Sequence, residues 1–152
     1  MTTVLMDAPE YDPAKARRRY ARILSALSLI VVIAAVWWFV RYWPQERAVD
    51  HFLTACEQKQ YEKAYGLWMA DPDWQKHPEK YNRYKFSDFE RDWAGGGELG
   101  LIREHKIEAA ERPKGGTTGV VVIVTINKRY EKAHFFVADE DKSLSFWRDF
   151  LY

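Results

Sequence analysis

The stretch from Ile23 to Val40 reads ILSALSLIVVIAAVWWFV, eighteen residues without a charge, a proline or a glycine. As a helix rising about 1.5 Å per residue it spans about 27 Å, close to the hydrocarbon thickness of a bilayer. It is apolar on every helical face, whereas a helix on the surface of a soluble domain keeps a polar face. We therefore predict a transmembrane helix over residues 23–43.

Aromatic and basic side chains flank this stretch as they do at membrane interfaces. Tryptophan and tyrosine settle at the level of the lipid headgroups, and arginine extends its charge outward from the hydrocarbon. The stretch is longer than the apolar region of a secretory signal peptide and no small-residue cleavage site follows it, so we expect an uncleaved anchor. The residues expected at the membrane interface are Arg17, Arg18, Arg19, Arg22, Trp37, Trp38, Arg41, Tyr42 and Trp43.

The distribution of basic residues predicts the orientation of the anchor. Five lysines and arginines precede the stretch, whereas only Arg41 and Arg47 follow it closely. Because basic flanks stay in the cytoplasm, we expect residues 1–22 to be a cytoplasmic basic tail in the cell membrane protein. Residues 44–152 then lie outside, in the periplasm if the protein is bacterial. A basic run can also bind nucleic acid, but beside a membrane span it more commonly contacts anionic lipid.

The composition after the anchor indicates one small domain with an aromatic core. Residues 41–152 carry eighteen basic and nineteen acidic side chains, a near-neutral balance without the basic footprint of a nucleic-acid-binding protein. The single cysteine excludes an intramolecular disulfide, so stability must come from the core. Seventeen of the 24 aromatic residues lie in residues 44–152, enough to build one.

Helical periodicity dominates the first half of this domain. Residues 49–56 and 61–68 each place apolar side chains on one helical face. Residues 71–85 contain two prolines and many charges, and we expect a loop. Residues 87–90, SDFE, match the S-x-x-E capping box that opens a helix, and the glycines at 95–97 end it.

In the second half of the domain, apolar and polar residues alternate instead of following the helical period. Residues 105–111 alternate, with Ile107 and Ala109 expected on one side of a strand, and residues 120–126 are strongly β-branched. Two further strands are expected at 133–137 and 144–147. Helices followed by antiparallel strands indicate an α+β fold. We predict one N-terminal transmembrane helix followed by two to three helices packed on a curved antiparallel sheet of about four strands.

Two segments resemble a known group of domains. The string Val49-Asp-His-Phe-Leu-Thr-Ala-Cys-Glu-Gln-Lys-Gln-Tyr-Glu-Lys-Ala-Tyr65 is similar to the opening V-x-x-F-L-x-A…Y-x-x-A-Y of nuclear-transport-factor-like (cystatin-like) cone domains, and Ser145-Phe-Trp-Arg-Asp-Phe150 resembles their final strand. The resemblance covers residues 45–152 and implies a cone-shaped fold, with membrane-anchored bacterial members common in the group. Its motifs are core positions that carry no chemistry.

The sequence offers weak candidates for catalysis and none for a cofactor. Ketosteroid isomerases and related dehydratases of the resembled group place an acid or base in the cone, which draws attention to His105, His134 and Asp88. Residues 95–100 match G-x-G-x-x-G, but a helix precedes them and a strand follows, the reverse of a dinucleotide site. The short acidic turns at 71–73 and 139–141 lack the calcium-loop pattern and are expected to be solvated. We expect no metal and no cofactor.

Two hypotheses for function remain open. The first is a single-pass, membrane-anchored extracytoplasmic domain that binds a protein partner through exposed aromatic residues, possible contacts being Trp74, Tyr81 and Tyr84, as an accessory subunit of a membrane or envelope complex. The alternative is a cavity that binds a small ligand or transfers a proton. A cone filled by Phe52, Trp68 and Phe136 favours the first hypothesis, and a closed pocket with a buried carboxylate or histidine favours the second.

Overall fold

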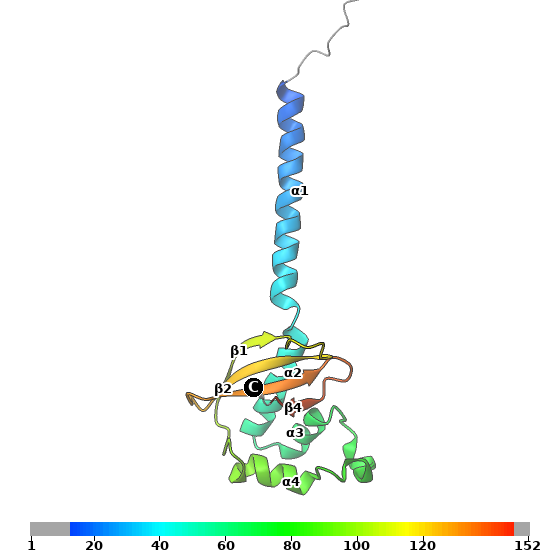
Figure 1. Ribbon diagram of the computed structural model, residues 1–152, viewed down its shortest axis with the longest axis vertical. Helices are drawn as coiled ribbons and strands as arrows, with labels where there is room; N and C mark the ends of the chain where they lie inside the picture. The colour runs from blue at the N-terminus through cyan, green and yellow to red at the C-terminus, as the bar shows by residue number, and fades with distance from the viewer. Residues whose placement is uncertain (1–12, 148–152) are drawn as a thin grey trace, which may run out of the picture. The chain divides into compact units, whose positions relative to one another are not determined.

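The computed structural model describes residues 13–147. They fall into two compact units that divide between Arg41 and Tyr42. The elements follow in this order (Figure 1): α1 (Pro13–Val40), α2 (Trp43–Glu57), α3 (Tyr61–Trp68), η1 (Trp74–Lys76), η2 (Pro78–Tyr81), α4 (Phe86–Arg91), η3 (Asp92–Gly96), β1 (His105–Glu111), β2 (Gly119–Ile126), β3 (Lys132–Ala138) and β4 (Leu144–Phe146).

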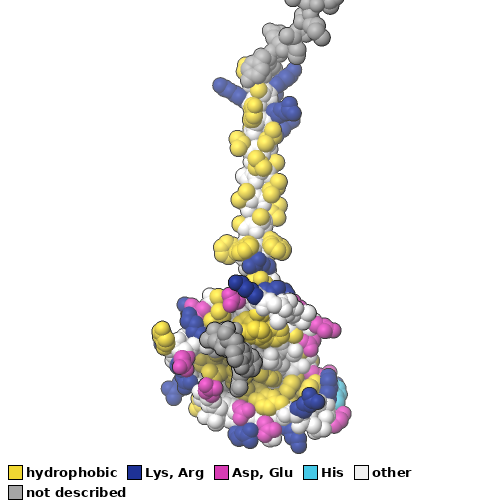
Figure 2. All heavy atoms as spheres, viewed as in Figure 1, with side chains coloured by type: hydrophobic (Ala, Val, Ile, Leu, Met, Phe, Trp, Pro, Cys, Tyr) yellow, Lys and Arg dark blue, Asp and Glu magenta, His cyan; other side chains and the backbone are white. Residues whose placement is uncertain are grey.

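The first unit is the helix α1, none of whose residues is buried. Figure 2 shows hydrophobic side chains along its length, with lysine and arginine side chains near its N-terminal end. Among residues 13–147, the helical segment that begins at Pro13 contains the one stretch long and apolar enough to cross a membrane. Ten residues of the predicted tail, 13–22, are therefore already helical, and residues 1–12 lie outside the described part.

The helix ends at Val40, three residues before the predicted end of the span. Arg41 and Tyr42 form a turn, and α2 begins at Trp43 with Pro44 in its first turn. Proline is tolerated there because the first N–H groups of a helix have no carbonyl partner within it. The helical path of the chain is thus interrupted just before Pro44.

The second unit has the predicted α+β fold, with a four-stranded antiparallel sheet in the order β1-β2-β3-β4. In the central pair of strands Val122 lies opposite Phe135, and both are buried. Helix α2 contacts β1, β2 and β3 (Figure 1), so it covers one face of the sheet. The three strands β1, β2 and β3 begin and end within a residue of the predicted segments.

A β-bulge in β1 makes one sequence expectation wrong. The register skips Glu108, so that Ile107 lies opposite Val124 but Ala109 lies opposite Ile123. One extra residue moves every later side chain to the other face of the sheet. Ala109 is accordingly exposed, and Ala110 packs against the core in its place.

Aromatic rings fill the space between the helices and the sheet. The ring of Phe52 on α2 lies 5.1 Å from that of Trp68, 4.8 Å from that of Trp93 and 6.1 Å from that of Phe135. From the sequence, Phe52, Trp68 and Phe136 were the rings expected to fill a cone. Phe52 and Trp68 do lie in this core, but Phe136 does not. It lies on the opposite face of β3, where it stacks on Trp147 at 5.6 Å.

The segment around α4 also departs from the expected capping box. The helix begins at Phe86, so Ser87 lies inside it, and no side chain caps its first turn. The loop expected at 71–85 contains the short helices η1 and η2. The helical segment ends as predicted in the glycine run, where Gly95 adopts φ of 108°, a backbone conformation that disfavours other residues.

The two adjacent phenylalanines of β3 provide a matched test of this core. Phe135→Ala should lower the free energy of unfolding by about 3–5 kcal/mol, because it opens a cavity among packed rings. Phe136→Ala removes a half-buried ring from the other face and should cost about 1 kcal/mol. Urea unfolding of the full chain in detergent measures both. Equal losses would contradict the assignment of the two faces.

Candidate functional site

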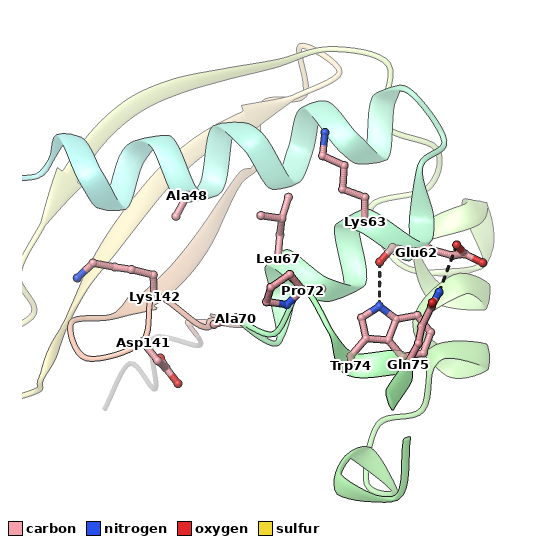
Figure 3. Close-up of a pocket in the computed structure, with 11 residues that line it drawn as sticks. Ala48, Glu62, Lys63, Leu67, Ala70, Pro72, Trp74, Gln75, Asp141 and Lys142 are labelled. Atoms are coloured by element: carbon pink, nitrogen blue, oxygen red, sulfur yellow. Dashed lines mark hydrogen bonds between the residues drawn. The ribbon is translucent and has the colours of Figure 1, made fainter. Parts of the chain in front are cut away.

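A groove of about 630 Å³ crosses the surface of the second unit (Figure 3). It is open to solvent and lies against α2, α3, the segment after α3 and the turn between β3 and β4. Its apolar part is formed mainly by small residues, Leu67 and the indole of Trp74, and charged side chains stand along it. The lining residues are Ala48, Glu62, Lys63, Gly66, Leu67, Ala70, Pro72, Trp74, Gln75, Asp141 and Lys142.

Three features fix Trp74 at the groove. Its indole Nε1 donates a hydrogen bond of 3.2 Å to the carbonyl oxygen of Glu62, in the first turn of α3 (Figure 3). Gly66 allows the returning chain to approach α3, because a Cβ there would lie 3.1 Å from the Asp71 carbonyl oxygen and 3.4 Å from Cδ1 of Trp74. The indole also stacks on Phe86 with ring centroids 5.1 Å apart. Trp74 is thus held in one orientation, with part of its surface in the groove.

The carboxylate of Asp71 organises the segment from α3 to η2. It accepts hydrogen bonds from the Tyr81 hydroxyl at 2.5 Å and from the Asp73 backbone N–H at 3.0 Å, and His77 Nε2 lies 3.2 Å away. The Tyr81 hydroxyl is the main cause that holds the pKa of Asp71 below its ordinary value, and His77 and Lys80 act in the same direction. The side chain is only 15% exposed. The expectation of a solvated acidic turn is therefore wrong at Asp71.

The three aromatic residues expected to stand exposed on this segment are half-buried instead. Trp74, Tyr81 and Tyr84 all pack against the hydrophobic core. The hydroxyl of Tyr65 donates to the Tyr84 carbonyl oxygen at 2.7 Å, and the Tyr84 hydroxyl donates to Asp92 at 3.2 Å. These bonds hold the rings inward. Their role in binding a partner stays a prediction, and Trp74 is the one that lines the groove.

His105 lies between two carboxylates of α2. Its Nδ1 is 2.6 Å from Glu57 Oε1 and its Nε2 is 3.0 Å from Asp50 Oδ1, and its side chain is 8% exposed. A carboxylate can only accept, so the two contacts are both hydrogen bonds when both ring nitrogens carry a proton. Such a ring has no free nitrogen to take a proton from a substrate. The arrangement suits a tie between α2 and β1 better than a general base.

The other two catalytic candidates do not join His105. His134 is on the face of β3 that α2 does not cover, and its side chain makes no hydrogen bond among the described residues. Asp88 on α4 forms an ion pair of 3.4 Å with Arg91. The structure therefore does not assemble the three into one site.

A second open cleft, of about 530 Å³, includes His134 but has no buried acid or base. Trp93, Ala133 and the 48% exposed ring of Phe146 supply its apolar lining. The charged side chains and the histidine that line it are exposed or half-exposed. The lining Tyr84 is half-buried, and burial raises the pKa of its hydroxyl, which stays protonated and donates to Asp92.

Cys56 and the acidic clusters offer no further chemistry. Burial raises the pKa of the Cys56 thiol to about 12, with Glu57 adding to the effect, so the thiol stays protonated and unreactive. Among residues 13–147, no three His, Cys, Asp or Glu side chains are placed to hold a metal ion. The glycine run at 95–100 follows a helix and precedes β1, as expected.

Comparison with protein-family models, with curated proteins and with solved structures finds no match for this chain. The resemblance to the nuclear-transport-factor-like group therefore stays an expectation.

Sequence reasoning missed two features of these sites. Asp50 and Glu57 are seven residues apart, a spacing that places both on one helical face and could have pointed to a shared partner. Asp71, in contrast, gives no such signal, because its partners Tyr81 and His77 reach it only through the path of the loop.

The contacts of His105 with Asp50 and Glu57 predict that replacing His105 destabilises the domain more than replacing His134. His105→Ala should lower the free energy of unfolding by about 2 kcal/mol, because it removes the ring that links Glu57 and the half-exposed Asp50 of α2 to β1. His134→Ala should change it by about 0.5 kcal/mol or less. Urea unfolding in detergent at neutral pH compares them. A loss at His134 as large as that at His105 would contradict the assigned roles.

The Asp71 network predicts a dependence on acid. The folded pKa of Asp71 lies below its ordinary value, so its contribution to stability is complete above that ordinary value and is lost as the pH falls through the folded pKa. Between about pH 5 and pH 2 the unfolding midpoint should therefore fall more steeply in the unaltered chain than in Tyr81→Phe. Tyr130→Phe, at a 98% exposed ring, is the control and should keep the full slope. An unchanged slope in Tyr81→Phe would be inconsistent with the network.

Proposed function

We propose that this chain is a single-pass membrane protein whose C-terminal domain lies outside the cytoplasm and binds a protein partner. The observation that carries the proposal is α1, which has no buried residue although eighteen of its consecutive residues carry no charge. A helix of this composition is stable when lipid surrounds it. Exposed tryptophans at one end, Trp37 and Trp38, suit the lipid headgroup region.

The excess of basic residues before the span supports a cytoplasmic N-terminus and an external domain. The domain itself supports the proposed kinship with nuclear-transport-factor-like cone domains through its helices, packed on one face of a four-stranded antiparallel sheet. That kinship would bring no catalytic residues with it, since function does not follow from a fold.

The filled interior favours binding over catalysis. Rings of Phe52, Trp68, Trp93 and Phe135 occupy the place where a cone-shaped enzyme would hold its substrate. The one nearly buried histidine, His105, has both nitrogens next to carboxylates. The chemistry available to the domain is therefore that of its surface.

The groove beside Trp74 is the surface that we assign to the partner. Leu67, Pro72 and the indole form an apolar strip, and Glu62, Lys63, Asp141 and Lys142 stand around it. An apolar centre with a polar rim is the usual anatomy of a protein interface. Trp74 is already held in place by Glu62 and Phe86, so binding would cost little conformational entropy at this ring.

Gln75→Cys in the full chain tests membrane insertion, orientation and docking together. Cys56 is buried and unreactive, so a membrane-impermeant maleimide with a photoreactive group should label only residue 75, and in intact cells. The chain should stay in the membrane through alkaline carbonate extraction. Illumination should then join it to a protein partner.

Lys114→Cys, at an exposed turn away from the groove, is the matched control and should be labelled without forming the adduct. Release by carbonate would contradict the membrane span. Labelling only after lysis would contradict the orientation. The same adducts at both positions, or none at residue 75, would contradict docking at the groove.

A further inference from the structure

We propose that the first two turns of α2 bind phospholipid phosphate groups through Trp43 and Arg47, so that the domain rests on the membrane surface as well as being tethered to it. The inference rests on the proposed membrane span of α1. It assigns a lipid contact to the folded domain itself, which a flexible tether would not require.

Trp43 and Arg47 form one exposed pair on α2. They are four residues apart and so share a helical face, and the guanidinium carbon of Arg47 lies 4.7 Å from the centre of the Trp43 ring. The indole is 54% exposed, although Gln45, Val49 and Phe52 on the other side of the helix are buried. A large aromatic ring exposed on a surface beside a membrane span is suited to the headgroup layer.

The charge of Arg47 has no protein partner within residues 13–147. Neither a hydrogen bond nor an ion pair joins it to another described residue, and its only described contact is the indole. A guanidinium offers five N–H donors in a planar fork that matches two phosphate oxygens. Stacking on the ring leaves the edge of this fork free. A phosphate group is therefore a suitable ligand for the unpaired guanidinium of Arg47.

The chain connection keeps this pair close to the bilayer. Only Arg41 and Tyr42 lie between the last residue of α1 and Trp43. Three peptide steps reach about 11 Å at most, so Trp43 lies within about two headgroup-layer thicknesses of the end of α1. A similar ring contact occurs within the first unit, where the guanidinium carbon of Arg41, the residue after α1, lies 3.7 Å from the centre of the Trp38 ring.

Fluorine NMR of the full chain in lipid nanodiscs tests the proposal. The tryptophans are replaced by 5-fluorotryptophan, and Trp43→Phe assigns the resonance of Trp43 by its loss. A phospholipid with a spin label on its headgroup should broaden that resonance strongly and leave the resonance of Trp74 sharp. Arg47→Gln should reduce the broadening by about half, because the phosphate contact that draws the ring to the headgroups is lost.

Arg83→Gln is the matched control, an exposed arginine without a described ion pair elsewhere on the domain, and should leave the broadening unchanged. Broadening of Trp43 by a water-soluble gadolinium chelate instead of the lipid label would overturn the inference and leave the membrane span intact. Equal effects of both arginine substitutions would overturn the role of Arg47. Failure of the chain to enter the nanodiscs would overturn the proposed function as well.

Discussion

The contact of Phe52 with the rings around it is the interaction on which the second unit depends. This one side chain on α2 touches Trp68 of α3, Trp93 of η3 and Phe135 of β3, so it joins elements that are distant in the sequence. The unit has no disulfide and no metal cluster among its described residues, and burial of such rings is the largest stabilising contribution open to it. The His105 tie holds the same helix to β1 at the edge of this cluster.

The core leaves few reactive groups in the interior. Packed rings fill it, and the titratable groups beside it are either paired, like His105, or kept neutral by burial, like Cys56. Ordered features also lie on the surface. Asp71 fixes the path of the chain after α3, and that path brings Trp74 to the wall of a groove. Binding sites are commonly built in this way.

The two units differ in their sequence patterns. Helix α1 is apolar on every face from residue 23 to residue 40 and has no buried residue. In the domain each helix and strand has two faces with different surroundings. Trp43 and Arg47 lie at the start of the second unit, where an exposed indole and an arginine without a described ion pair occur together on an otherwise amphipathic helix.

The sequence alone determined the features that depend on local spacing. The apolar length of residues 23–40, the helical period from Val49 to Trp68 and the alternation in the strands each follow from which side chains share a face, and these predicted α1, the two helices and the four strands. The membrane location, the partner and the resemblance to cone domains remain proposals that rest on the same patterns.

Tertiary structure decided whatever depends on contacts between distant segments. The bulge at Glu108 is set by pairing with β2, and it moved Ala109 to the exposed face. Pairing also put Phe135, and not Phe136, into the core. The expected exposed aromatics turned inward because Asp71, Tyr65 and Asp92 bind their hydroxyl or carbonyl groups across the fold. Residue spacing in the sequence does not predict such partners, because only the path of the folded chain brings them together.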